Sequence, residues 1–194
     1  MVENGIRLLG ISGSVRRGSY NGMLLEFAKS LLPSGVTMEL FDIAGIPIFD
    51  QDSEKGPLPE KVNELKSRIK AADAILICTP EYNYTIPAVL KNALEWASRP
   101  YGTNAFDRKP VALMSASTEI GGGTVAQYHL RQIMVYLNAF VLNKPTVLVP
   151  EAQDHFSSTG KLMDEEMKIR LQTLLENLVK WTRLIKYGID SDLI

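Results

Sequence analysis

The loop over residues 12–22 gathers residue types that suit a phosphate group. Ser14, Ser19 and Asn21 offer neutral hydrogen-bond donors, and Arg16 offers a guanidinium that can form paired bonds to phosphate oxygens. The loop leads into a predicted helix, whose first N–H groups and dipole favour an anion. A turn with an N-cap serine or asparagine and solvated arginines is the alternative.

This loop differs from the common nucleotide-binding motifs. Gly13 and Gly18 have the glycine spacing of a P-loop, but Ser19 and Tyr20 stand where the P-loop lysine and hydroxyl residue belong. The glycine fingerprint of dinucleotide-binding folds is also missing from it. A phosphate held without a catalytic lysine suggests a bound cofactor more than a phosphoryl-transfer substrate.

Two later loops have unusual sequences of their own. Residues 79–87 (TPEYNYTIP) contain two stiffening prolines, two tyrosines and an asparagine, which suit a flat heteroaromatic ring with a polar rim. Residues 115–123 end in three glycines, which permit close approach of the backbone to a ligand. The alternatives are a rigid strand-to-helix turn for the first and a flexible loop for the second.

Apolar periodicity indicates the elements that would position these loops. Short apolar runs predict strands over 6–11, 36–43, 74–79, 111–115 and 141–149, the last interrupted near Pro145. Spacing of three to four residues predicts helices over 23–32, 60–72, 87–100 and 124–138, and a terminal helix from Met167 to a C-cap at Gly188. Five alternations of strand and helix predict a five-stranded parallel sheet with helices on both faces. We expect a single domain over 1–194, with the three loops at the carboxyl edge of the sheet.

Composition narrows the class of protein further. A formal net charge of -1 argues against nucleic-acid binding, and no apolar run is long enough to span a membrane. The N-terminus lacks the apolar stretch of a signal peptide, so we expect a cytoplasmic protein. Cys78, the single cysteine, is expected in the core rather than as a redox thiol. His129 and His155 lack partners at metal spacing, so no metal site is expected.

The chain resembles the NADPH-dependent FMN reductase family, which includes chromate/quinone and azobenzene reductases. The matching segments are GSVRRGSYN (13–21), PEYNYTIPAVLKNALEW (80–96) and QYHLRQIMVYLNAFVLNKP (127–145). The resemblance implies a flavodoxin-like fold with non-covalently bound FMN. It also implies NAD(P)H as co-substrate and a homodimer or homotetramer.

Carried over by position, the resemblance assigns nine residues to the cofactor site. Ser14, Arg16, Ser19 and Asn21 would hold the FMN phosphate. The flavin ring would be bordered, largely through backbone groups, by Pro80, Glu81, Tyr82 and Asn83. Ser117 would lie at the flavin's edge, whereas Glu119 stands where the family often has glycine and is left out of the site.

The leading hypothesis is therefore an enzyme that passes electrons from NAD(P)H through FMN to a small-molecule acceptor. Quinones, azo compounds, flavins or metal oxyanions such as chromate are the expected acceptors. No side chain need act as acid or base, since the cofactor carries the chemistry, so no catalytic residue is assigned. The alternatives are a flavodoxin-type electron carrier, disfavoured by the near-neutral charge and the two arginines, and a flavin-free anion-binding domain.

Overall fold

Parallel strands form one sheet within residues 5–194, the part of the chain that the computed structural model describes. The central strands are β1 (Ile6–Ser12), β3 (Ala74–Cys78) and β4 (Pro110–Ala116), with β2 (Val36–Phe41) at one edge. The order is β2-β1-β3-β4-β5, and every pairing is parallel. This is the flavodoxin-like order, in which the chain reverses its direction of travel across the sheet between β1 and β3.

The fifth position of the sheet is divided between two short strands. β5 (Phe140–Val141) pairs with the start of β4, and β6 (Val147–Val149) pairs with its end. The prediction of one interrupted strand is thus refined to six segments in five positions. Pro145 lies in the gap, where a residue without an N–H donor cannot continue the ladder.

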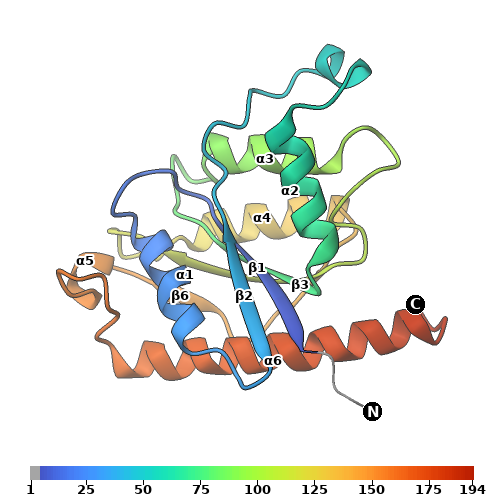
Figure 1. Cartoon of the computed structure of the whole chain (residues 1–194). Coiled ribbons are helices and arrows are strands. Elements are labelled where there is room, and N and C mark those ends of the chain that lie inside the picture. The colour runs from blue at the N-terminus through green and yellow to red at the C-terminus, as the bar shows by residue number, and fades with distance from the viewer. Residues whose placement is uncertain (1–4) are drawn as a thin grey trace.

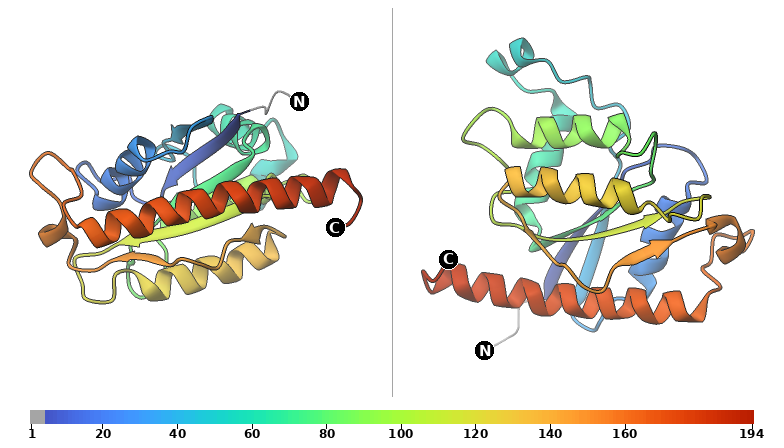
Figure 2. Two further views of the ribbon diagram at one scale, coloured as in Figure 1. Left: turned by 90° about the horizontal axis from the view of Figure 1, so that it is seen from below. Right: turned by 180° about the vertical axis from the view of Figure 1, so that it is seen from behind.

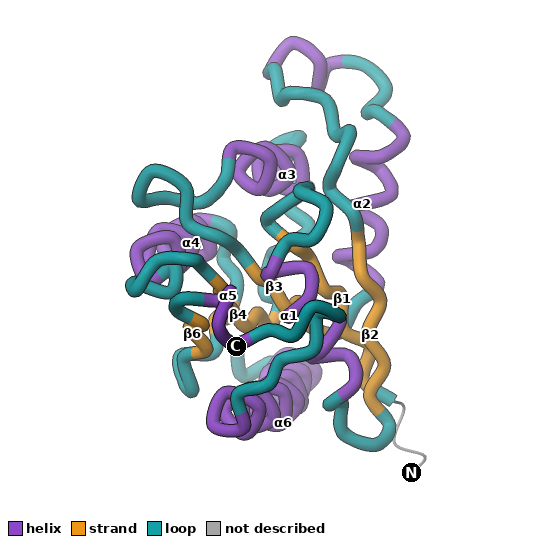
Figure 3. The backbone as a smooth tube through the Cα atoms, turned by 90° about the vertical axis from the view of Figure 1, so that its left-hand side faces the viewer, coloured by secondary structure: helices purple, strands orange, loops and turns teal. Residues whose placement is uncertain are grey.

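Helices cover both faces of the sheet, as predicted (Figures 1 and 2). One face carries α1 (Tyr20–Ser30) and the long α6 (Glu165–Asp190). The other carries α2 (Glu60–Ala71), α3 (Ala88–Ser98) and α4 (Thr124–Tyr136). Figure 3 shows α2, α3 and α4 above the strands and α6 below them.

Two buried cores follow from the alternation of side chains along the central strands. Leu8 of β1 packs with α1 and α6, whereas its neighbour Leu9 packs with α2, α3 and α4. The same alternation runs along β3, where Ile75 and Ile77 pack with α2, α3 and α4, and Leu76 packs with α1 and α6. Because both faces are covered, the strands read as continuous apolar runs.

Some predicted boundaries were wrong. α1 begins at Tyr20, three residues before the predicted start, because its first turn includes Asn21 and Gly22, which the apolar spacing does not mark. Gly188 was predicted as a C-cap, but it lies inside α6, which continues to Asp190 with Ser191 as its cap. The predicted loops also contain two short helices, η1 (Gln51–Lys55) and α5 (Ala152–His155). Within the described residues, no helix is both long and apolar enough to cross a membrane.

Candidate functional site

The three unusual loops leave the sheet at one edge, as predicted. Ser12, the last residue of β1, is the register partner of Cys78 at the end of β3. The next residues continue this pairing, because the Gly13 N–H donates to the Cys78 carbonyl at 2.7 Å. The Thr79 N–H likewise donates to the carbonyl of Met114 in β4, at 3.0 Å. The loops therefore meet at the point where strand order reverses, the usual ligand position in such sheets.

A pocket of about 370 Å³ lies between these loops. A volume of that size falls in the range of cofactor sites, about 300–1,000 Å³. Of the nine predicted site residues, all but Asn83 line it. The full lining is Ser14, Arg16, Ser19, Tyr20, Asn21, Pro80, Glu81, Tyr82, Ala116, Ser117 and Thr118.

The first loop holds its donors ready for an anion. The Ser12 hydroxyl accepts from the Ser14 N–H at 3.2 Å, and the Ser14 hydroxyl accepts from the Arg16 N–H at 3.3 Å. Gly18 has a φ of +68°, a conformation that side chains disfavour, and it lets the chain turn into α1. Ser19 is the N-cap, and its hydroxyl makes no capping bond. The first N–H groups of α1 and the Ser19 hydroxyl thus remain available to a phosphate. The exposed Arg16 side chain makes only a long 3.4 Å bond from Nη1 to the Arg17 carbonyl, so its other donors can reach a phosphate as well.

The Asn21 side chain is engaged within the protein, unlike the Ser19 hydroxyl. Its side chain is 2% exposed, and its amide bonds both backbone groups of Ala116. The Nδ2 group donates to the Ala116 carbonyl at 2.8 Å, and Oδ1 accepts from the Ala116 N–H at 2.9 Å. The side chain therefore fastens α1 to the end of β4. Because both polar groups of the side chain are engaged, a contact between Asn21 and a phosphate would have to come from its backbone N–H. That contact stays a prediction.

The second loop is rigid and is anchored on α4. Tyr82 and Thr85 exchange backbone hydrogen bonds at 2.9 and 3.0 Å, closing a turn. The two residues between them, Asn83 and Tyr84, have positive φ values of 50° and 60°, the pattern of a type I′ turn. The Glu81 carboxylate accepts from the Ala126 N–H in the first turn of α4 at 3.0 Å. That bond engages the carboxylate, so a ligand would meet mainly the backbone of this loop.

The third loop is also held in place, and its glycines serve packing. The Ser117 N–H donates to Val149 at 3.0 Å, and the Ser117 hydroxyl accepts from the Glu119 N–H at 3.1 Å. Gly122 and Gly123 are buried with positive φ, and a Cβ on Gly123 would lie 2.7 Å from that of Ser115. Neither glycine lines the pocket. Their close neighbours are Leu148 and Pro150 for Gly122, and Ser115 and Thr79 for Gly123. That this glycine run approaches a ligand stays a prediction.

The cysteine and the two histidines are the other side chains that could do chemistry, and the structure gives none of them a catalytic or metal-binding set of partners. Complete burial raises the pKa of the Cys78 thiol, which donates to the Asn21 Oδ1 at 3.2 Å. His155 contacts Asp164 at 2.9 Å, and His129 contacts the Thr85 hydroxyl at 3.0 Å. Residues 5–194 contain no group of three His, Cys, Asp or Glu side chains arranged to hold a metal ion.

Sequence reasoning missed part of the surroundings. Tyr20, Ala116 and Thr118 line the pocket as well; they lie in the loops singled out from the sequence but were not assigned to the site. A second pocket, of about 530 Å³, adjoins the first loop and includes Lys161, which is distant in sequence. No local pattern around Lys161 indicates that placement, because the contact forms only when the chain returns to α1.

A flavodoxin-like sheet with an anion-binding first loop and a pocket at the switch point defines a flavoprotein scaffold of the FMN-binding type. Comparison with known proteins agrees with this class and narrows it. The sequence profile described as NADPH-dependent FMN reductase matches residues 6–154, and the chain belongs to that family. It is an oxidoreductase that uses FMN and NAD(P)H, which sets aside the carrier and flavin-free alternatives.

Relatives cover nearly the whole chain. An NAD(P)H-dependent FMN reductase of Pseudomonas aeruginosa is 44% identical over 95% of this chain and 100% of its own. A 2-hydroxy-1,4-benzoquinone reductase of a Burkholderia species is 36% identical over 92% of this chain and 97% of its own. The solved structure of FerB, an NAD(P)H:acceptor oxidoreductase from Paracoccus denitrificans, superposes with a TM-score of 0.84 at 30% identity. That superposition covers 92% of this chain and 97% of FerB.

Proposed function

We propose that this chain, as a single domain over 1–194, binds one FMN in the pocket between its three loops. The observation that supports this most directly is the convergence of eight predicted site residues on that pocket. The phosphate would lie at the N-terminus of α1, with Ser14, Arg16 and Ser19. The ring would lie against the backbone of Pro80–Asn83, with Ser117 at its edge.

The residues present fit this cofactor. The first loop supplies positive charge and N–H donors at one end of the pocket, as a phosphate dianion requires. The other end has the buried Pro80 and the half-exposed Tyr82, which offer apolar and aromatic surface to a flat ring. When bound, FMN supplies the hydride and electron transfer, which no side chain can perform.

The protein's own contribution is to bind and orient. Asn21 fixes the phosphate loop to the end of β4, and Glu81 fixes the ring loop to α4. Both anchors hold loop backbone groups at set positions, so little ordering cost falls on cofactor binding. No side chain is required to transfer a proton in this proposal.

The acceptor is proposed as a small oxidant, with quinones first. Support comes from the relatives named for quinone or benzoquinone reduction, including one that covers 92% of this chain. Azo compounds, free flavins and metal oxyanions such as chromate belong to the same proposal. Because NAD(P)H is the electron donor, we place the enzyme in the cytoplasm.

We further propose a homodimer or homotetramer. Exposed aromatic and apolar side chains lie on α4 and on the turn after β3. A hydrogen bond between His129 of α4 and Thr85 of the turn holds these two segments together. Tyr84 is 77% exposed and Tyr136 is 79% exposed. A second copy of this chain would cover such a surface. Light scattering at micromolar protein should give at least twice 21.5 kDa, and a monomer mass would contradict this part of the proposal.

The decisive test of function uses purified protein reconstituted with FMN. We expect a yellow complex with about one FMN per chain, which loses flavin absorbance when NADH or NADPH is added anaerobically. Added benzoquinone should restore the absorbance. A colourless protein that fails to take up FMN, or a complex that neither nucleotide reduces, would refute the proposed function.

A further inference from the structure

A groove of about 530 Å³ runs beside the proposed phosphate site. Its near end shares Ser14, Arg16 and Ser19 with the pocket described above. From there it follows one face of α1, and its opposite wall is the turn over 159–161. The residues along α1 are Gly22, Met23, Glu26, Phe27 and Ser30. The groove therefore continues from the phosphate end of the pocket, away from the ring loops.

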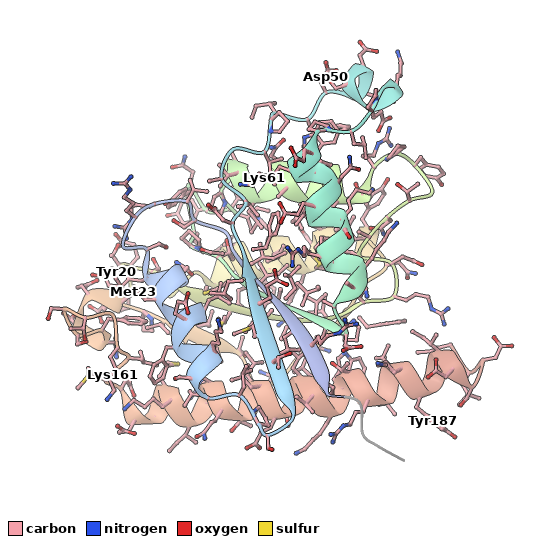
Figure 4. All side chains as sticks on the ribbon, in the orientation of Figure 1. Tyr20, Met23, Asp50, Lys61, Lys161 and Tyr187 are labelled. Carbon is pink, nitrogen blue, oxygen red and sulfur yellow. The ribbon has the colours of Figure 1, made fainter. Side chains whose placement is uncertain are left out.

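The opposite wall is a built feature of the fold. Ser157 and Lys161 exchange backbone and side-chain hydrogen bonds at 2.9 and 3.1 Å, and Phe156 pairs with Leu162 beyond them. Phe156 also packs on the Tyr20 ring of α1 at a centroid distance of 5.5 Å. In Figure 4 the labelled Met23 and Lys161 lie on α1 and on this neighbouring turn.

The turn approaches α1 closely at Gly160. A Cβ built on Gly160 would lie 3.2 Å from the Met23 Cγ. The φ of Gly160 is +79°, a backbone conformation that residues with side chains rarely adopt. Glycine at this position lets the turn lie against the helix and sets the width of the groove. Lys161 then lines the groove together with Arg16.

The groove combines two cations, one carboxylate and two apolar side chains. Arg16 and Lys161 are cations that suit phosphate oxygens, and Lys161 contributes from a different part of the chain. Glu26, further along α1, is a carboxylate that suits the paired hydroxyls of a ribose. Met23 and Phe27 are half-buried and offer apolar surface to a flat base.

From this combination we propose that the groove binds the adenosine diphosphate half of a dinucleotide. Lys161 contacts the phosphates, Glu26 the ribose hydroxyls, and Met23 and Phe27 the adenine. Two ligands carry that group, the nicotinamide co-substrate and FAD in place of FMN. The proposal rests on the proposed function, because it assumes that the adjoining pocket holds a flavin.

The first experiment uses ADP as the probe and calorimetry as the readout. ADP is titrated into the FMN-loaded protein and into the FMN-free protein. We expect saturable binding to at least one of them, weakened about tenfold in Lys161→Ala, a factor equal to about 1.4 kcal/mol. Lys61→Ala is the matched control, because Lys61 lies on α2 on the opposite face of the sheet (Figure 4).

Two further measurements distinguish the sources of the adenosine group. If ADP binds the FMN-loaded protein, Lys161→Ala should raise the KM for the nicotinamide nucleotide without changing FMN affinity. If ADP binds only the FMN-free protein, FAD should bind that protein more tightly than FMN, and Lys161→Ala should remove the difference.

Three results would overturn the proposal. The first is no ADP binding to either form, and the second is equal ADP binding in wild type and Lys161→Ala. The third is a loss of FMN affinity in Lys161→Ala as large as the loss of ADP affinity, because Lys161 would then belong to the FMN phosphate site. Each result leaves the proposed function intact provided that the wild type binds FMN and turns over, so the two failures are separable.

Discussion

Replacing Asn21 with alanine tests whether this residue positions the site or contacts the ligand. The side chain is almost fully buried and bonds both the N–H and the carbonyl of Ala116, at 2.9 and 2.8 Å. Asn21→Ala leaves both groups buried without a partner. Each unsatisfied group costs about 1–3 kcal/mol, so we expect the two together to lower the free energy of unfolding by about 2–6 kcal/mol.

The assay is thermal unfolding of the FMN-free protein, where ligand contacts cannot contribute. For a chain of this size each kcal/mol lowers Tm by about 2–4 °C, so a fall of about 10 °C is expected. Asn63→Ala serves as the matched control. Its amide donates to the Leu58 carbonyl at 3.0 Å in an exposed setting, so its loss should cost less than about 1 kcal/mol.

One outcome would refute the positioning role of Asn21. If Asn21→Ala unfolds at the wild-type temperature yet loses FMN affinity, its side chain must contact the cofactor directly. The hydrogen bonds to Ala116 would then contribute little to the fold.

The other predictions concern the phosphate contact, a buried lysine and the cysteine. Arg16→Ala should keep wild-type stability but weaken FMN binding about tenfold or more, since a charge-assisted bond is worth about 1.5–3 kcal/mol; unchanged affinity in a fluorescence titration would exclude that contact. Burial lowers the pKa of Lys66 from 10.5 to about 8, because the folded protein destabilises the charged form of this side chain. The free energy of unfolding of wild type relative to Lys66→Met should therefore rise between pH 8 and 10.5, by at most about 1.4 kcal/mol per pH unit, and a flat difference in urea titrations would contradict this. Cys78→Ala should retain quinone turnover because burial raises the pKa of this thiol, whereas a loss above tenfold would indicate a redox role.

The amino-acid sequence alone determined the class of fold and most of the site. Short apolar runs alternating with helical periodicity specify a parallel sheet, because buried strands and amphipathic helices have different periods. Parallel strands also place their following loops at one edge, so residues as distant as Ser14, Glu81 and Ser117 could be predicted to meet. Those predictions follow from local chemistry and chain direction.

What each of those side chains does there was decided by tertiary structure. The side chains of Asn21 and Glu81 bond the backbone of Ala116 and Ala126, partners that no local pattern reveals. The glycine run over 121–123 left open whether it meets a ligand or only forms a loop, and in the structure Gly123 is required by its packing against Ser115. Lys161 joins the groove because a distant turn returns to α1. Hydrogen-bond partners, and the residues a groove brings together, depend on segments far apart in the chain, so they become defined only when the whole fold forms.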